Sequence, residues 1–286
     1  MQQQKLLQKE LLNTLKIINK MQNTINNTSP IGFFDSGVGG LSVLSRFKNV
    51  LPNENIIYYG DTIHLPYGNK TRDELVGYAR NILDFMQTKG VKAVVIACNT
   101  SSAQAYDSVK DIYPFPIYPI IQSCVKGLGV NNYKRIGVFA TEATVKSGKY
   151  SEELKKGNSN ILVKEIASKN WVGIVEGVID NIDECRANIQ FEIEEMLKFN
   201  PDKIILGCTH YPYLMKEFVK YAPQEIFIDP AEIFVKYLKQ ELSMRELLTT
   251  NTGESASEEF FVSSNPEEFV KNAEIFYQIN KLPKIV

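Results

Sequence analysis

From residue 31 onwards, short apolar runs alternate with longer stretches in which apolar residues recur at helical spacing. The runs are rich in Val and Ile and largely lack polar alternation, which is typical of strands buried on both faces of a parallel sheet. The pattern predicts strands at residues 31–34, 55–59, 93–97, 117–120, 135–139, 161–166, 203–206 and 225–228. Helices are predicted at residues 41–50, 71–89, 102–112, 147–156, 171–179, 185–199, 212–221 and 231–240. This alternation predicts an α/β fold with right-handed crossovers.

A stretch rich in Gly and Asn, residues 127–134, separates two groups of four predicted strands. We therefore expect two lobes, the first over residues 30–126 and the second over residues 127–235. The tail adds one more predicted strand, at residues 260–262, with a helix after it. We expect this tail, residues 236–286, to return to the first lobe.

Residues 1–29 differ from the rest of the chain, with five Gln, five Asn and four Lys against one Glu. Their apolar residues still recur at alternating spacings of four and three, which predicts a helical stripe. The stripe consists of Leu7, Leu11, Ile18, Met21 and Ile25. We expect a helix that lies on the body of the protein. Two alternatives remain open: the helix pairs with a partner or with a second copy in a homodimer, or the segment is disordered.

Composition narrows the classes of protein further. The 286 residues are 44% hydrophobic and 23% charged, with a net charge of −1, which argues against a general nucleic-acid-binding surface. No run of about 18 apolar residues occurs, so we expect no membrane span and no secretory signal. The four cysteines contain no CxxC pair, and we expect free thiols in the reducing cytoplasm.

Ligands of open α/β sheets bind beyond the carboxyl ends of the strands. The small, polar and reactive residues that follow the predicted strands are Asp35-Ser36-Gly37-Val38-Gly39-Gly40, Gly60-Asp61, Leu65-Pro66-Tyr67-Gly68, Cys98-Asn99-Thr100-Ser101, Thr141 and Gly207-Cys208-Thr209-His210. We expect a site where these strand ends meet. The glycine loop matches neither GxGxxG nor a P-loop, which disfavours nucleotide binding and indicates a tight turn that lets the backbone approach a ligand. Cys98, Cys208, His210 and His64 lack the usual spacing of zinc ligands, so no metal is expected.

Two cysteine motifs give the sharpest chemical signal. Cys98-Asn99-Thr100 and Cys208-Thr209-His210 lie 110 residues apart, each after a predicted strand and before a predicted helix. A helix N-terminus lowers the pKa of a nearby thiol, so we expect a lowered pKa at both positions. We interpret Cys124 and Cys185 as small buried side chains.

Two opposed thiols suit the inversion of a stereocentre through a carbanion, because a base is then needed on one face and an acid on the other. His210 and Asp35 are the candidates to exchange protons with the thiols. A thiol hydrolase, which needs a single nucleophilic cysteine and would leave the second dispensable, is the alternative.

Four of these motifs together resemble the glutamate racemases, members of the cofactor-independent aspartate/glutamate racemase superfamily. The motifs are Asp35-Ser36-Gly37-Val38-Gly39-Gly40-Leu41, Leu65-Pro66-Tyr67-Gly68, Ala97-Cys98-Asn99-Thr100 and Gly207-Cys208-Thr209-His210-Tyr211-Pro212. The resemblance covers residues 30–286. It implies two flavodoxin-like lobes with the site in the cleft between them, and interconversion of L- and D-glutamate without pyridoxal phosphate or metal. It also implies a role in supplying D-glutamate for bacterial peptidoglycan.

The resemblance further implies the role of each site residue. Cys98 and Cys208 correspond to the acid/base thiols, Asp35 and His210 to their supporting groups, and Glu176 to a further acidic residue. The implied substrate contacts are Asp35, Ser36, Tyr67, Gly68, Asn99, Thr100, Thr209 and His210. The segment Ser168-Lys169-Asn170-Trp171 departs from the Cys-Pro-Leu pattern of the family. A racemase that acts on aspartate, and a non-catalytic amino-acid-binding regulator on the same scaffold, are the alternatives.

Overall fold

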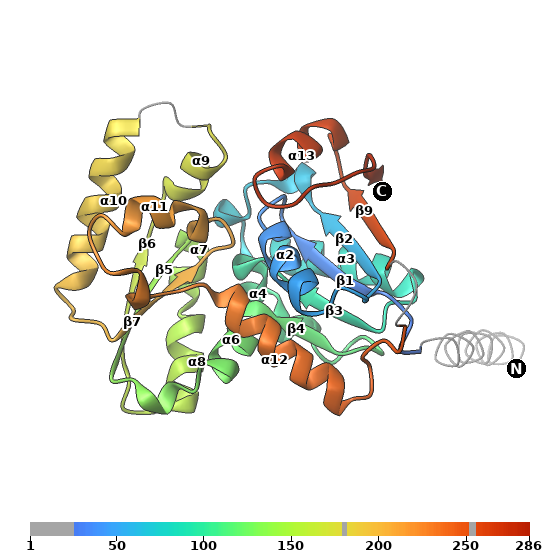
Figure 1. Ribbon diagram of the computed structural model, residues 1–286, viewed down its shortest axis with the longest axis horizontal. Helices are drawn as coiled ribbons and strands as arrows, with labels where there is room; N and C mark the ends of the chain where they lie inside the picture. Colours follow the sequence, from blue (N-terminus) through green and yellow to red (C-terminus); the bar gives the residue numbers. More distant parts are fainter. Residues whose placement is uncertain (1–25, 179–181, 252–255) are drawn as a thin grey trace, which may run out of the picture.

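The computed structural model describes residues 26–178, 182–251 and 256–286, which form two sheets with helices on both faces (Figure 1). The larger sheet has the strand order β10-β9-β2-β1-β3-β4 and the smaller has the order β6-β5-β7-β8. Every strand pairs with its neighbours in parallel. The strands are β1 Ile31–Asp35, β2 Ile56–Gly60, β3 Ala93–Ile96, β4 Ile117–Pro119, β5 Arg135–Ala140, β6 Leu162–Ala167, β7 Lys203–Gly207, β8 Phe227–Ile228, β9 Glu258–Val262 and β10 Lys284–Ile285.

Helices follow nearly all of these strands. The α-helices are α2 Leu41–Val50, α3 Arg72–Thr88, α4 Asn99–Gln104, α5 Tyr106–Val109, α6 Ile120–Leu128, α7 Glu142–Ser147, α8 Lys149–Gly157, α9 Trp171–Val175, α10 Ile182–Leu197, α11 Met215–Phe218, α12 Pro230–Met244 and α13 Pro266–Ala273. Short 3-10 helices are η1 Thr62–His64, η2 Tyr67–Asn69, η3 Val130–Asn132, η4 Tyr211–Leu214 and η5 Gln224–Ile226. None of the described helices is long and apolar enough to cross a membrane.

The predicted α/β fold is confirmed, and each of the eight strands predicted before residue 230 is present. Several details of the helix prediction were wrong. Helices α6 and α7 were not predicted, the helix predicted at residues 102–112 is divided into α4 and α5, and the one predicted at 171–179 ends at Val175. The helix predicted at 212–221 is a 3-10 turn followed by the short α11, and the one predicted at 147–156 begins at Lys149 as α8. Gly148 has a φ of 63°, a left-handed conformation that separates α7 from α8.

The strands are apolar without alternation because helices cover both faces of the sheet. All five residues of β1 are buried. Phe33 packs on one face, where its ring contacts Phe47 of α2 at 5.0 Å between centroids. Phe34 packs on the other face, in a cluster with Leu83 of α3.

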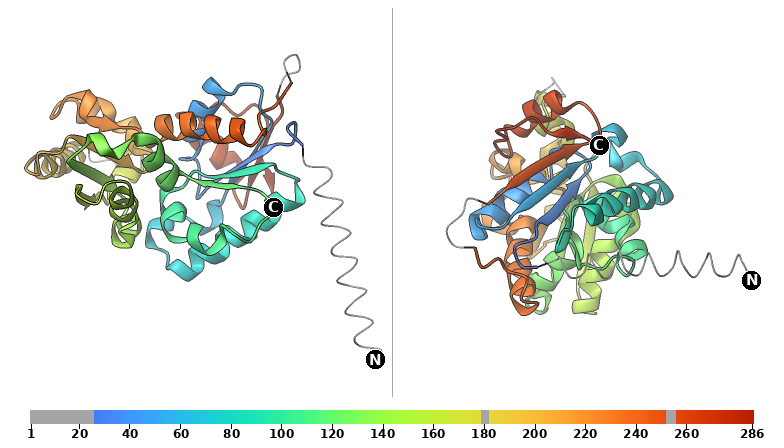
Figure 2. Two further views of the ribbon diagram at one scale, coloured as in Figure 1. Left: turned by 90° about the horizontal axis from the view of Figure 1, so that it is seen from below. Right: turned by 90° about the vertical axis from the view of Figure 1, so that its right-hand side faces the viewer.

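Helix α12 connects the two lobes. It follows β8 of the smaller sheet and packs against α6 and α2 of the first lobe, and Figure 2 (left) shows it, in orange, beside α2. An ion pair at 2.8 Å joins Arg46 of α2 to Asp229 at the start of α12. The chain then returns to the larger sheet, where β9 pairs with β2. The domain boundaries at residues 127 and 236 stay a prediction.

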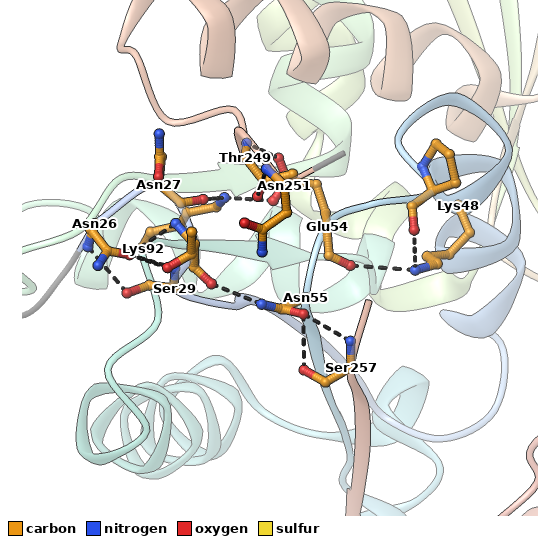
Figure 3. Close-up of polar contacts among 12 residues, drawn as sticks. Asn26, Asn27, Ser29, Lys48, Glu54, Asn55, Lys92, Thr249, Asn251 and Ser257 are labelled. Carbon is orange, nitrogen blue, oxygen red and sulfur yellow. Dashed lines mark hydrogen bonds and ion pairs between the residues drawn. The ribbon is translucent and has the colours of Figure 1, made fainter. Parts of the chain in front are cut away.

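A buried ion pair lies at the amino ends of the first-lobe strands, away from their carboxyl ends (Figure 3). The Lys92 Nζ and a Glu54 carboxylate oxygen are 2.5 Å apart, and both side chains are almost fully buried. Lys92 also donates to the Asn27 carbonyl at 2.5 Å, and Glu54 accepts the Thr249 amide proton at 2.8 Å. The pair therefore fixes the chain before β1 and after α12 to the base of the sheet. The helical stripe predicted within residues 1–25 lies outside the described residues.

Candidate active site

A cavity of about 460 Å³ lies between the lobes, where the carboxyl ends of strands from both sheets meet. Each residue that the sequence singled out for catalysis or substrate binding lines this cavity. They are Asp35, Ser36, Tyr67, Gly68, Cys98, Asn99, Thr100, Glu176, Cys208, Thr209 and His210. Parallel strands bring these positions together because their carboxyl ends share one edge of the sheet.

Cys98 belongs to the first lobe, between β3 and α4. It is the N-cap residue of α4, and its sulfur accepts the Ser101 amide proton at 3.5 Å. Burial raises the pKa of this thiol to about 12, and the nearby charge of Asp35 acts in the same direction. The hydrogen bonds to Ser101 oppose the change but do not outweigh it. The predicted lowering of the Cys98 pKa is therefore wrong, since burial exceeds the effect of one short helix.

Cys208 belongs to the second lobe and follows β7. Its sulfur lies 3.8 Å from Nδ1 of His210, and the other ring nitrogen of His210 lies 2.9 Å from a carboxylate oxygen of Glu176. Burial disfavours the charged imidazole, but the hydrogen bonds to Cys208 and Glu176 outweigh it and raise the pKa of His210 to about 10. The raised pKa favours the cationic form of His210, placed between the Cys208 sulfur and the Glu176 carboxylate.

The glycine loop of the first lobe reaches across to the Cys208 loop. A Cβ atom on Gly39 would lie 2.3 Å from the Thr209 hydroxyl and 2.4 Å from the His210 ring, so only glycine fits there. Asp35 begins the loop and accepts the Gly37 amide proton at 3.0 Å. Burial raises the pKa of the Asp35 carboxyl, although Gly37 and the charge of His210 act against it.

Three further predicted contacts, Tyr67, Asn99 and Thr100, come from the segments that follow β2 and β3. The Tyr67 hydroxyl donates its proton to Asp61 at 2.5 Å, so toward a substrate this hydroxyl can act only as an acceptor. Thr100 and Thr141 form a hydrogen bond at 3.0 Å between their hydroxyls, which joins the lobes beside the cavity. The Asn99 carboxamide oxygen accepts a hydrogen bond from Tyr150 at 2.7 Å.

Several lining residues were not among the site residues predicted from the sequence. Thr141, which the sequence analysis named at a strand end but gave no role, follows β5 together with Glu142, and Ser168 and Lys169 follow β6, where the same rule of strand ends applies. The Ser168 hydroxyl donates to Glu192 of α10, and burial raises the pKa of this glutamate to about 7. The other lining residues not singled out for a role are Gly37, Leu65, Pro66, Asn69 and Val172.

The residues weighed as zinc ligands are not all brought together. His64 does not line the cavity, because its ring stacks on Tyr78 at 3.9 Å and bonds to Asp61 at 2.8 Å. Within the described part of the chain, no three His, Cys, Asp or Glu side chains are arranged to hold a metal ion. Cys124 and Cys185 are buried and lie outside the cavity, as expected.

The two parallel-sheet lobes and the shared cavity with one thiol from each lobe place the chain among the Asp/Glu/hydantoin racemases, whose family model matches residues 41–238. The glutamate racemase of Picosynechococcus sp. is 37% identical over 245 residues, which cover 85% of this chain and 87% of that relative. The chain belongs to the glutamate racemase family.

Solved structures agree with this assignment. The glutamate racemase of Francisella tularensis, solved in complex with D-glutamate, is 34% identical with a TM-score of 0.81, covering 91% of this chain and 98% of that one. The glutamate racemase isoform RacE1 of Bacillus anthracis is 28% identical with a TM-score of 0.84, over the same shares of the two chains. The two flavodoxin-like lobes expected from the sequence are therefore confirmed.

Proposed function

We propose that the protein interconverts L- and D-glutamate with Cys98 and Cys208 as its two acid/base groups, and so supplies D-glutamate for peptidoglycan. The observation that carries this proposal is that the two thiols come from different lobes and line one cavity. A substrate α-carbon held between the lobes then has one thiol available to each face.

In one direction, a Cys208 thiolate takes the α-proton from one face of the substrate and becomes a thiol. The carbanion takes the proton of the Cys98 thiol on its other face, which leaves a Cys98 thiolate. The reverse direction exchanges the roles. The His210 cation, which pairs with Glu176, donates a hydrogen bond toward the Cys208 sulfur. In the first lobe, Asp35 is the acid or base that exchanges protons with Cys98.

Substrate binding is assigned to polar groups around the thiols. The groups that offer hydrogen bonds to the ammonium and the two carboxylates are those of Asp35, Ser36, Tyr67, Asn99, Thr100, Thr209 and His210, together with the backbone at Gly68. Thr141 and Lys169 add a hydroxyl and a positive charge at the second-lobe wall of the cavity. No pyridoxal phosphate or metal is part of this proposal.

Circular dichroism of the purified protein with L-glutamate, D-glutamate and L-aspartate, without added cofactor, tests the activity. We expect both glutamate enantiomers to racemise, with activity that survives chelator and hydroxylamine. Activity restored only by pyridoxal phosphate or a metal would contradict the mechanism. Turnover of aspartate alone would favour an aspartate racemase, and binding of glutamate without turnover would favour a regulator.

Variants in heavy water test the two thiols. Either enantiomer should give product deuterated at the α-carbon, while recovered substrate stays protiated early in the reaction. Cys98→Ala and Cys208→Ala should each lose racemisation, by at least about 10²-fold, and the control Cys124→Ala, which lies outside the cavity, should retain it. Early deuterium in recovered substrate would indicate one shared base. A Cys208→Ala variant that still racemises at a comparable rate would indicate a single-thiol enzyme.

We further propose a cytoplasmic location, since the four cysteines are free. Cell fractionation tests it, and recovery of the protein in an oxidising compartment would contradict it. A homodimer is also proposed. Analytical ultracentrifugation of the full chain and of a chain without residues 1–25 measures the assembly and the contribution of that segment, and a monomer at micromolar concentration would refute the dimer.

A further inference from the structure

Tyr150 reaches from the second lobe into the first. It lies near the start of α8 and is fully buried. Its hydroxyl donates to the side-chain oxygen of Asn99 at 2.7 Å, and Asn99 is the residue that follows Cys98 and lines the cavity. Burial raises the pKa of the Tyr150 phenol well above its ordinary value, so the hydroxyl remains a donor.

The same side chain also contacts the loop that carries the second thiol. A Cβ atom on Gly207 would lie 2.8 Å from the Tyr150 ring, and Gly207 immediately precedes Cys208. The ring therefore packs closely against the Gly207 backbone, while the hydroxyl extends to Asn99. One residue thus touches the neighbours of both thiols.

The start of α8 is attached to the first lobe by a second contact that does not involve Tyr150. Lys149 is nearly buried and pairs with Asp107 of α5 at 2.7 Å. Loss of the Tyr150 hydroxyl alone, as in Tyr150→Phe, therefore leaves α8 attached to the first lobe. This substitution also keeps the ring that packs against Gly207.

The hydroxyl determines which part of the Asn99 side chain is available to a ligand. A carboxamide has one oxygen that accepts and one nitrogen that donates two protons. Tyr150 occupies the oxygen, and the nitrogen is buried and has no hydrogen-bond partner among the described residues. A buried donor without a partner is costly, and a carboxylate group of a substrate would satisfy it.

We propose that Tyr150 is a positioning residue, which acts across the two lobes to hold the Asn99 amide with its N–H groups free for a substrate carboxylate. This inference rests on the proposed function for the identity of the substrate. Without the hydroxyl, the amide can rotate by half a turn and present its oxygen to the carboxylate, which repels it.

Kinetics of Tyr150→Phe and Asn99→Ala, alone and combined, test the inference. Because the amide contacts a carboxylate in both the bound substrate and the transition state, its loss should raise KM more than it lowers kcat. We expect Tyr150→Phe to raise KM about tenfold with kcat within about threefold. The combined variant should be no worse than Asn99→Ala, since Tyr150 acts through Asn99. Tyr277→Phe, whose hydroxyl bonds to Glu258 outside the cavity, is the matched control and should leave both constants unchanged.

Calorimetric measurement of D-glutamate binding distinguishes a failure of the proposed racemase function from a failure of the proposed role of Tyr150. A wild-type protein that binds glutamate but does not turn it over would refute the proposed function. The Kd of Tyr150→Phe, expected to be about tenfold higher, would still test the role of Tyr150. Wild-type constants in Tyr150→Phe, or effects of the two substitutions that simply multiply, would overturn the inference. A protein that binds no glutamate would overturn both.

Discussion

Glu176→Gln should lower the pKa of His210. The substitution keeps the size of the side chain and a hydrogen-bonding group but removes the negative charge that lies 2.9 Å from the imidazole. The His210 cation is then less stabilised relative to the neutral ring. Its pKa should therefore fall toward the ordinary value.

The size of the decrease follows from the surroundings of the ring. The pKa of His210 is about 10, against an ordinary 6.5. Burial alone would lower this pKa, but the hydrogen bonds to Cys208 and Glu176 stabilise the cation and raise it. Removal of one opposite charge at this distance changes a pKa by about one to three pH units. Since Cys208 remains, we expect the variant to titrate between about 7 and about 9.

The composition of the chain makes this measurement practical. It has two histidines, so ¹⁵N-histidine labelling gives the signals of two imidazoles, and His64→Gln assigns them. Chemical shifts of the ring nitrogens from pH 5.5 to 10.5 give the pKa of His210 in each protein. Glu142→Gln is the matched control, because Glu142 also lines the cavity but pairs with Lys146.

Two results would refute the reasoning. The His210 pKa could be the same in Glu176→Gln as in the wild type, in which case the carboxylate does not stabilise the cation. Alternatively, Glu142→Gln could lower it equally, and the cause would then be the overall charge of the cavity and not the Glu176 contact.

Three further predictions concern glycine packing, a buried ion pair and a buried carboxyl. Gly39→Ala should lower kcat/KM at least about tenfold, because its Cβ would lie 2.3 Å from the Thr209 hydroxyl of the second lobe. The control Gly77→Ala in α3 has open space around it, so it should keep activity and raise the free energy of unfolding by about 0.5–1 kcal/mol. Lys92→Met should lower the free energy of unfolding, measured by urea denaturation, by about 3–5 kcal/mol, because it leaves Glu54 buried without its partner. The control Lys110→Met, at the surface, should change this free energy by less than about 0.5 kcal/mol. Glu192 has a folded pKa of about 7, raised by burial from 4.5, so its stabilising effect is complete below pH 4.5 and is lost as the pH rises through 7. Urea unfolding of Glu192→Gln at pH 5 and pH 8 should show the variant gaining stability relative to the wild type at the higher pH, and an equal difference at both would exclude this titration.

The location of the cavity was predictable because it depends on chain topology alone. Asp35, Cys98 and Cys208 each follow an apolar run, and parallel strands place such positions at one edge. The rule also reaches Thr141 and Ser168, which follow β5 and β6. Local sequence patterns therefore carry most of the information about which loops meet.

The contacts between the lobes were not predictable in the same way. Tyr150 reaches Asn99 over 51 residues of sequence, and Lys92 reaches Glu54 over 38 residues, with no periodicity that connects either pair. The direction of the Cys98 pKa also depends on burial, which the local motif does not report. A helix N-terminus is visible in sequence, whereas the depth at which it lies is a property of the whole fold.

Cys98 and Cys208 have equivalent roles in the proposed reaction, yet their surroundings are unlike. Burial and the Asp35 charge raise the pKa of Cys98 to about 12, so this thiol is protonated at neutral pH, whereas the Cys208 sulfur faces a cationic imidazole. Enantiomers have equal free energies in water, so kcat/KM must be the same in both directions however unlike the thiols are. The asymmetry can therefore appear only in the separate values of kcat and KM, and in which proton transfer limits each direction. Unequal kcat values for the two enantiomers at an equal kcat/KM would be the kinetic sign of this asymmetry.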